Sequence, residues 1–545
     1  MGDSFRIACL QTPAFGLDEA VKAADYLLRE VERAASLNPA PDLLLLPECA
    51  YPAYFLAPVQ DQDIDSYLRD LGAPDTAAFC AALSERARRY GVAIAAGLAL
   101  PGPGGLENGL VLWDRDGREV RRTAKMFLWH FDGCWFNPGQ DVAIAEAAGV
   151  NLGLFICADG RLPEIPRLLA LGGADLLLDA TNWVTTGRDP KQLPNSQADY
   201  MMRVRAMENR VYVAAANKVG READTIVYCG KSTVIGPDGR VLAVASTDQP
   251  EILVAEVPLE GGRLAGAGRY APLDGVLDPL GARRPRAYPR LSLEEAHGIT
   301  TDPYIAVAQV AEEDGASVDR LLADLEVFGA ALVLLPEGRP GGPGLDFWLE
   351  RSRQRGCYLL ATGDSAMDGA IGGAVAKAAG GRRQRAAWLL LRGEVIHTWV
   401  KGHLSLDEAD YVAGPAEPDL WEGPWGKVGV MQGGEGLLPE VARGLALAGA
   451  DLILWPARHP GPTPELFART RAAENRVFVA MANPAVAGGE SLIATPDQAV
   501  AARTFPGARQ AVGATLVLGI SRHKELAPGT DALGGHRTSA FKRLA

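Results

Sequence analysis

The chain has no run of 18 or more apolar residues, so we expect no membrane-spanning helix and no membrane partner. Its seven cysteines are scattered and odd in number, and no CxxC pair or His/Cys cluster has the spacing of metal ligands. This argues against a disulfide framework and a metal site, and nothing in the sequence predicts a cofactor. The N-terminus shows no secretory signal, so a reduced cytoplasmic location is expected.

An excess of basic residues is also absent. The 54 Lys and Arg residues are outnumbered by 67 Asp and Glu, and the net charge of -13 argues against nucleic acid as a partner. Gly-rich stretches at 102–105 and 341–344 lack a following Lys-Ser/Thr pair, so we interpret them as loops, not as phosphate-binding sites. At 545 residues the chain is too long for one ordinary domain.

Apolar strands and amphipathic helices alternate along the first half of the chain. The helical pattern at 64–90 is interrupted near 72–75, and the Arg-Asp-Gly turn at 115–117 indicates a hairpin. The main predicted strands are 5–11, 42–46, 92–99 and 211–216, and the main predicted helices are 17–36, 64–90 and 196–209. This alternation predicts a layered α/β fold.

The pattern then starts again, which indicates two copies of one domain. Residues 162–178 and 438–454 are identical at 12 of 17 positions, and 205–217 matches 471–483 in the same order. The predicted division is a first domain at 1–262, a linker or arm at 263–300, a second domain at 301–522 and a C-terminal tail at 523–545.

Cys157 stands at the end of an apolar run and before a helix that Pro163 and Glu164 open. A cysteine at such a strand-to-helix elbow lies on the open edge of an α/β sheet, where sites form. Nearby helix-terminal N–H groups can stabilise its thiolate. A lone cysteine in this position is also compatible with a small buried side chain that only packs.

An alignment of the two copies shows that they share the acid and the base but differ at the nucleophile position. Glu48 matches Glu337, and Lys125 matches Lys401 at the same spacing that puts Gly433 opposite Cys157. The second copy therefore has the acid and the base but no thiol.

The three residue types of the first copy form a coherent chemistry. A Cys157 thiolate attacks an electrophilic carbon, and the Glu48 carboxylate takes the thiol proton and later protonates the leaving amine. Lys125 and the backbone N–H of Ala158 then stabilise the oxyanion of a tetrahedral intermediate. Taken singly, Glu48 is more ordinarily interpreted as an exposed turn acid and Lys125 as a solvated strand residue.

These residues and their surroundings resemble the nitrilase superfamily of carbon–nitrogen hydrolases. The resemblance rests on LLLLPECAYP, RTAKMFLW, FNPG, FICADGRLPE and RAMENRVYVAAANKVG, and it covers nearly all of copy one and most of copy two. It implies a fold of two αββα sandwich domains in tandem and a Glu48–Lys125–Cys157 triad. A second glutamate usually follows the lysine in this family, and Asp132 stands at that position here.

The resemblance also implies an intramolecular pseudo-dimer with one working site, because family domains commonly pair face to face. Further homo-oligomerisation is left open. A soluble and fully active monomer made of copy one alone would contradict this hypothesis.

The segment Cys-Ala-Asp-Gly-Arg at 157–161 favours hydrolysis of an amide or N-carbamoyl bond over a nitrile, since family nitrilases tend to have Cys-Trp-Glu. The predicted partner is a small-molecule amide or carbamoyl substrate. Alternatives left open are nitrile hydrolysis, acyl or amide transfer on the same triad, and a non-enzymatic scaffold. The candidate substrate-binding residues are Tyr54, Trp129, Ala158, Asn182 and Trp183.

Other residues near the motifs are weaker candidates. Cys49 and Cys134 lie beside Glu48 and Asp132, and we expect both to pack, Cys49 because strand geometry would turn it away from Glu48. Arg188 is a possible ligand for a substrate carboxylate, although a solvated arginine is the more ordinary interpretation.

Overall fold

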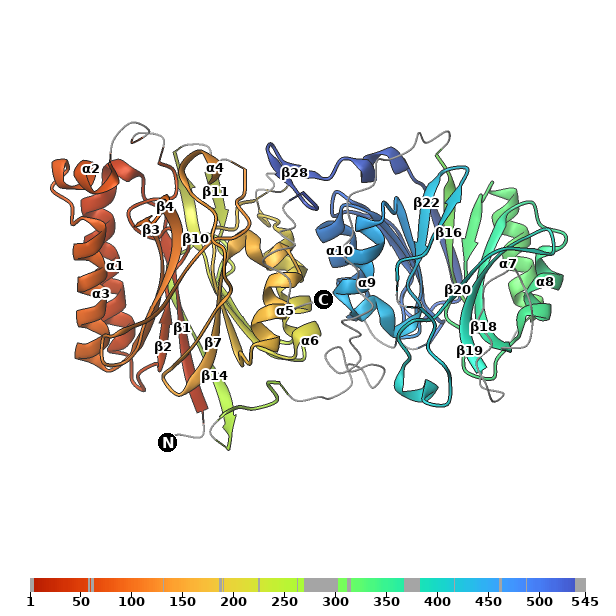
Figure 1. Ribbon diagram of the computed structural model, residues 1–545, viewed down its shortest axis with the longest axis horizontal. Coiled ribbons are helices and arrows are strands. Elements are labelled where there is room, and N and C mark those ends of the chain that lie inside the picture. The colour runs from red at the N-terminus through yellow and green to blue at the C-terminus, as the bar shows by residue number, and fades with distance from the viewer. Residues whose placement is uncertain are drawn as a thin grey trace. The chain divides into compact units, whose positions relative to one another are not determined.

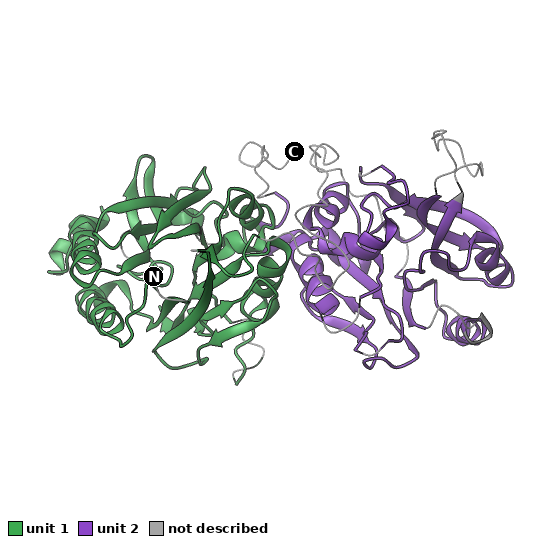
Figure 2. Ribbon diagram, turned by 90° about the horizontal axis from the view of Figure 1, so that it is seen from below, with its two compact units in different colours: residues 1–269, 527–530, 539–543 green, residues 270–526, 531–538, 544–545 purple. Residues whose placement is uncertain are grey.

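The computed structural model describes residues 4–56, 59, 63–130, 132–185, 189, 191–223, 226–261, 263–268, 302–310, 315–366, 383–415, 417–459, 463–486 and 488–534. The chain forms two compact units (Figure 2): unit 1 is built around residues 4–268 and unit 2 around residues 302–526. Residues 527–530 belong to unit 1 and 531–534 to unit 2. Arg188 and most of the predicted arm at 263–300 lie outside the described residues, and the predicted domain limits stay predictions.

Unit 1 contains two sheets. The first has the order β11-β10-β1-β2-β3-β4-β5 with β14 on β1, and the second has the order β13-β12-β9-β8-β7-β6. The first-sheet strands are β1 (Ser4–Pro13), β2 (Leu43–Leu45), β3 (Ala93–Gly102), β4 (Gly105–Trp113), β5 (Glu119–Ala124), β10 (Lys218–Glu222), β11 (Ile226–Cys229), β14 (Glu251–Glu260) and β15 (Arg263–Leu264). The second-sheet strands are β6 (Ala143–Ala147), β7 (Val150–Ile156), β8 (Leu176–Ala180), β9 (Tyr212–Ala216), β12 (Thr233–Ile235) and β13 (Val241–Val244).

Helices cover the outer face of each sheet of unit 1, which makes four layers (Figure 1). Strands β1 and β4 of the first sheet contact β9 and β7 of the second. The helices are α1 (Ala20–Ala35), α2 (Ile64–Asp70), α3 (Thr76–Tyr90), α4 (Asp132–Trp135), α5 (Glu164–Leu171), the π-helical turn η4 (Gln197–Met201) and α6 (Met202–Asn209). This confirms the α/β class and the sandwich layering.

Local sequence accounts for these elements. Ala23, Leu27 and Val31 lie on one face of α1 and are buried in the core beneath the helix. The break expected near 72–75 is confirmed, because Asp75 caps α3 by accepting a hydrogen bond from the backbone N–H of Ala78. The hairpin at 115–117 is confirmed as the β4–β5 pair.

Unit 2 repeats the four layers with two six-stranded sheets, β20-β19-β18-β17-β16-β27 and β21-β22-β23-β24-β25-β26. Apolar residues from both sheets, such as Leu332 and Leu452, share one core cluster. The strands are β16 (Tyr304–Gln309), β17 (Leu332–Leu334), β18 (Tyr358–Ala366), β19 (Arg383–Leu391), β20 (Glu394–Val400), β21 (Leu420–Gly423), β22 (Gly426–Val430), β23 (Leu452–Pro456), β24 (Phe478–Ala482), β25 (Leu492–Ala494), β26 (Val500–Arg503) and β27 (Gln510–Thr515). The helices are α7 (Gly315–Val327), α8 (Leu345–Ser352), α9 (Pro439–Leu447) and α10 (Thr463–Asn475).

Short 3-10 turns and one hairpin complete the described elements: η1 (Leu17–Glu19), η3 (Cys157–Arg161), η6 (Leu406–Glu408), η7 (Gly433–Leu437), η8 (Leu518–Arg522), β28 (Glu525–Ala527) and β29 (Thr530–Asp531). None of the helices in the described part of the chain combines the length and apolar character needed to cross a bilayer.

Candidate active site

Lys125 and Cys157 directly follow the last residues of β5 and β7, and Glu48 lies three residues beyond the end of β2. Strands β2 and β7 are parallel to their neighbours β1 and β8, so these ends lie at the carboxyl edge where α/β sheets form sites. The chain passes close under Glu48, since a Cβ atom on Gly97 would lie 2.3 Å from the carbonyl oxygen of Pro47. Only glycine fits there.

Lys125 lies between two carboxylates. Its Nζ is 2.7 Å from Oε1 of Glu48 and 2.7 Å from Oδ2 of Asp132, and all three side chains are fully buried. Burial lowers the pKa of Lys125, but the negative charges of Asp132 and Glu48 together outweigh it and hold that pKa well above its ordinary value. Lys125 is therefore a fixed ammonium ion in a site with little solvent.

The two oxygens of Glu48 differ in their surroundings. Oε1 accepts hydrogen bonds from Nζ of Lys125 at 2.7 Å and from Nδ2 of Asn108 at 2.6 Å. Oε2 is buried and has no hydrogen-bond partner within the described ranges. One oxygen is thus held in place while the other is free to exchange a proton.

Asp132 is held by three donors. Its Oδ2 accepts from the backbone N–H of Trp129 at 2.7 Å as well as from Lys125, and its Oδ1 accepts from the hydroxyl of Tyr54 at 2.7 Å. Burial and the charge of Asp132 raise the pKa of the Tyr54 phenol well above its usual range. Asp132, although one methylene shorter than the glutamate usual in the family, is therefore in contact with Lys125.

Cys157 begins the turn η3 directly after β7, and its φ of 48° lies in the left-handed region. Such a backbone is uncommon for a non-glycine residue and turns the side chain sharply out of the strand. Burial and then the charge of Glu48 raise the pKa of the thiol well above its ordinary value, whereas Lys125 lowers it. The thiol and the Glu48–Lys125 pair are therefore electrostatically coupled.

The turn η3 separates β7 from the helix α5, and α5 begins at Glu164 after Pro163, as the sequence predicted. Ala158 is the second residue of η3, where backbone N–H groups have no partner inside the helix. The carbonyl of Cys157 accepts a hydrogen bond of 2.7 Å from Nε2 of Gln197 on η4. The elbow is thus anchored by a neighbouring helix.

Asp159 fastens the elbow to the lysine loop. Its carboxylate accepts from the backbone N–H groups of Met126 at 3.0 Å, Phe127 at 2.7 Å and Ile156 at 3.1 Å. Burial raises the pKa of Asp159 to about 7, and these three N–H groups oppose the rise. Sequence reasoning missed Asp159, although both copies have an acid at this position, Asp159 and Glu435.

The other predicted binding residues follow the same sheet edge. Asn182 and Trp183 come after β8, the parallel neighbour of β7, and both are buried. Neither polar atom of the Asn182 side chain has a hydrogen-bond partner in the described structure, so its amide is available to a ligand. Trp129 is half-buried, and the Arg161 guanidinium lies 4.6 Å from its ring centroid.

The two cysteines beside the site differ from each other. Cys49 is fully buried in the core cluster, so it packs as expected, but the chain turns with a φ of 40° there and the strand geometry offered as the reason does not persist. Cys134 is exposed, so its prediction as a packing residue was wrong. It lies on the four-residue helix α4, which is too short to bury all of its faces.

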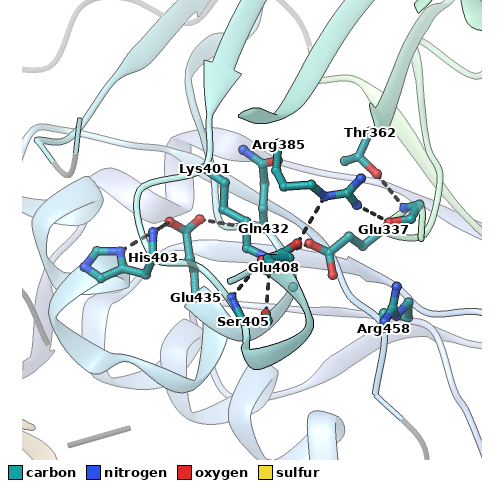
Figure 3. Close-up of polar contacts among 12 residues, drawn as sticks. Glu337, Thr362, Arg385, Lys401, His403, Ser405, Glu408, Gln432, Glu435 and Arg458 are labelled. Atoms are coloured by element: carbon teal, nitrogen blue, oxygen red, sulfur yellow. Dashed lines mark hydrogen bonds and ion pairs between the residues drawn. The ribbon is translucent and has the colours of Figure 1, made fainter. Parts of the chain in front are cut away.

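Unit 2 has the same frame without the thiol (Figure 3). Nζ of Lys401 is 2.7 Å from Oε1 of Glu337 and 2.8 Å from Oε2 of Glu408, which stands at the position of Asp132. Arg385 takes the position of Asn108 and lies 3.1 Å from Glu408. Two cations thus face the two carboxylates.

Other contacts of unit 2 also match those of unit 1. Glu435 accepts from the backbone N–H groups of Gly402 at 2.9 Å and His403 at 3.0 Å, as Asp159 does from Met126 and Phe127. Within the described ranges, no group of three or more His, Cys, Asp or Glu side chains is placed to hold a metal ion.

Comparison with known proteins places this chain in a family. The family model described as carbon-nitrogen hydrolase matches residues 6–266 and 395–519. The chain is 31% identical over 293 residues to the "Hydrolase in pqqF 5'region" of Pseudomonas protegens, which covers 53% of this chain and 92% of that protein. It is 28% identical to the 2-oxoglutaramate amidase of Bacillus subtilis, over 47% of this chain and 91% of that relative.

A solved amidase from Nesterenkonia sp. is 28% identical, has a TM-score of 0.41, and covers 47% of this chain and 92% of its own. The family match extends over well over half of the residues and reaches into both units. The chain therefore belongs to the carbon-nitrogen hydrolases of the nitrilase superfamily, as its motifs predicted.

Proposed function

We propose that unit 1 hydrolyses a small amide or N-carbamoyl compound through an acyl group carried on Cys157. The observation that supports this most directly is the buried Lys125 ammonium, held 2.7 Å from both Glu48 and Asp132 at the sheet edge that also bears Cys157. A base, a fixed cation and a thiol are the groups that acyl transfer from nitrogen requires.

In the first step Sγ of Cys157 attacks the carbonyl carbon of the substrate. Oε2 of Glu48, the oxygen without a hydrogen-bond partner among the described residues, takes the thiol proton as the S–C bond forms. Proton transfer and attack occur together, which suits a thiol whose pKa burial holds well above its ordinary value. The negative charge passes to the substrate oxygen.

Lys125 and the backbone N–H of Ala158 stabilise that oxyanion. When the intermediate collapses, the C–N bond breaks and Glu48 returns its proton to the leaving nitrogen, which departs as ammonia or an amine. A water molecule then attacks the thioester or thiocarbamate, and Glu48 takes one of its protons. The S–C bond breaks, and Glu48 returns that proton to Sγ, which restores the thiol. Glu48 thus alternates between base and acid.

Asp132 acts through Lys125 as a positioning residue. Its carboxylate raises the pKa of the lysine and, with Tyr54 and the Trp129 N–H, fixes the direction of the ammonium group. The amide of Asn182, which has no hydrogen-bond partner among the described residues, is suited to bind the substrate's polar end. Trp129, Ala158 and Trp183 complete the proposed substrate-binding set.

The test is ammonia release from short amides, N-carbamoyl amino acids, ureas and nitriles, measured for the native chain beside Cys157→Ala. We expect turnover of an amide or carbamoyl compound that disappears in the variant. Turnover of nitriles alone would replace the bond class but keep the nucleophile. Activity that persists in the folded Cys157→Ala protein would contradict the proposed role of the thiol.

A further inference from the structure

Another buried acid, Asp179, contacts the backbone of Cys157. Asp179 belongs to β8 and pairs with Phe155 of β7 in the parallel register. Its Oδ1 accepts a hydrogen bond of 2.8 Å from the backbone N–H of Cys157. Its Oδ2 is buried and has no hydrogen-bond partner in the described structure. Among the described residues, the hydrogen bond of this carboxyl group is therefore to the backbone of Cys157.

The charges around Asp179 disfavour ionisation. Its side chain is fully buried, and within the described ranges no Lys, Arg or His lies at ion-pair distance. Burial raises its pKa well above the usual range; the N–H of Cys157 opposes this, Glu48 and Asp159 add to it, and Lys125 lowers it. A buried carboxylate with one hydrogen bond and no adjacent cation is costly, so the neutral acid is the favoured form.

Unit 2 supplies an internal comparison. Trp455 occupies the position of Asp179, and its Nε1 donates a hydrogen bond of 2.8 Å to the carbonyl of Gly433. The contact with the elbow is thus reversed, from accepting an N–H to donating to a carbonyl. In unit 1, which has the thiol, the carboxyl group of Asp179 accepts the backbone N–H of the elbow residue Cys157.

We propose that Asp179 is a positioning residue for Cys157, a neutral carboxylic acid that accepts the Cys157 N–H and fixes the left-handed elbow without adding negative charge beside the thiol. This rests on the proposed role of Cys157 as nucleophile. The backbone at Cys157, with its φ of 48°, needs external support because L-residues disfavour that conformation. A further carboxylate beside Cys157 would oppose thiolate formation, whereas a neutral acid does not.

The test compares Asp179→Asn with Asp179→Leu in the full chain. Asparagine reproduces a neutral acid, since it keeps a carbonyl acceptor and has a donor in place of the O–H. Leucine has a similar size but no acceptor. Alkylation of Cys157 by iodoacetamide is followed against pH by peptide mass spectrometry, beside kcat and KM on the substrate found in the panel. Exposed Cys134 is the internal control for reagent reactivity.

For Asp179→Asn we expect an unchanged alkylation midpoint and a kcat within about threefold of native. For Asp179→Leu we expect kcat to fall about 10- to 100-fold with little change in KM, because one buried N–H loses its acceptor. Thermal unfolding establishes that each variant is folded. If the leucine variant does not fold, the asparagine variant alone decides whether the acid is neutral.

Two results would overturn the proposal. A midpoint that falls by about one pH unit or more in Asp179→Asn would mean that the acid is ionised in the native chain. A folded Asp179→Leu protein with native kcat and native alkylation would remove any positioning role. Absence of turnover across the whole panel would count against the proposed function alone, because the alkylation midpoints still report on Asp179.

Discussion

A Cβ atom on Gly433 would lie 2.2 Å from Oε2 of Glu337. Gly433 has a φ of 52°, close to the 48° of Cys157, so the two elbows have the same backbone. In unit 2 the Glu337 carboxylate, held 2.7 Å from Lys401, occupies the space in which a cysteine side chain would start. The second site has therefore lost both its nucleophile and the room for one.

This predicts that Gly433→Cys does not create a second active site. In a Cys157→Ala background the added cysteine must displace Glu337 from Lys401, so we expect no ammonia release. The free energy of unfolding should fall by about 1–3 kcal/mol, because overpacking adds to the strain of a left-handed non-glycine residue. Turnover assays and urea unfolding measure the two effects.

The matched control is Gly433→Ala, which adds the same Cβ without a thiol. It should lose about as much stability as Gly433→Cys. Measurable turnover by the double variant Cys157→Ala/Gly433→Cys would show that Glu337 moves aside easily and would contradict the prediction.

The equivalent lysines of the two units, Lys125 and Lys401, should differ in function but not in structural importance. Lys125→Met removes the proposed oxyanion cation, so we expect kcat to fall by about 10²–10³-fold or more. Lys401→Met leaves Arg385 as the buried cation beside Glu337 and Glu408, so the free energy of unfolding should fall by about 3–5 kcal/mol. The kcat per folded molecule should not change.

Active-site titration with a radiolabelled alkylating agent normalises kcat to the folded fraction in both lysine variants. Equal losses of kcat in the two folded proteins would mean that unit 2 takes part in the chemistry. A native kcat in the folded Lys125→Met protein would instead remove Lys125 from the proposed mechanism.

Tyr54→Phe and Asp132→Asn should separate the effect of the Tyr54–Asp132 hydrogen bond from the effect of the Asp132 charge on Lys125. Phenylalanine removes one hydrogen bond to Asp132 but leaves its charge, so we expect a loss of about 1 kcal/mol in stability and a kcat lower by about three- to tenfold.

Asparagine at position 132 removes the charge beside Lys125 and lowers the pKa of that lysine. We therefore expect kcat to fall about 100-fold and the alkaline limb of the pH–rate profile to move to lower pH. An unmoved limb in Asp132→Asn would argue against charge control of Lys125.

His459 makes stability depend on pH in the acid range. Burial lowers its pKa to about 4 from 6.5, so between those values the unfolded chain binds a proton that the folded chain does not. Its stability contribution is complete above about pH 6.5 and is lost as pH falls toward 4, by about 3 kcal/mol in all. Urea unfolding of native and His459→Gln chains at several pH values should show a flatter curve for the variant. Parallel curves would exclude His459 as the source.

The candidate site was predictable where it depended on strand ends. Glu48, Lys125 and Cys157 each lie at or just beyond a strand end, and the second copy marked them by keeping two and losing the third. Asn108 was not found, because its side chain lies within a strand, and the pairing of β4 with β3 and of β3 with β2 brings it beside Glu48. Cys134 was misjudged because exposure depends on how much of the short α4 is covered.

The duplication, the α/β layers and the family could be predicted from the amino-acid sequence, because those follow from local patterning and from motifs that repeat in order. The protonation and the partners of each buried acid and cation could not, because they depend on tertiary contacts. Glu48 with one free oxygen, Asp179 behind the Cys157 N–H and Glu337 in the space beside Gly433 all depend on residues far apart in the chain. The physical reason is that burial and partner geometry, which control charge and proton exchange, arise only when separate strands meet at one edge.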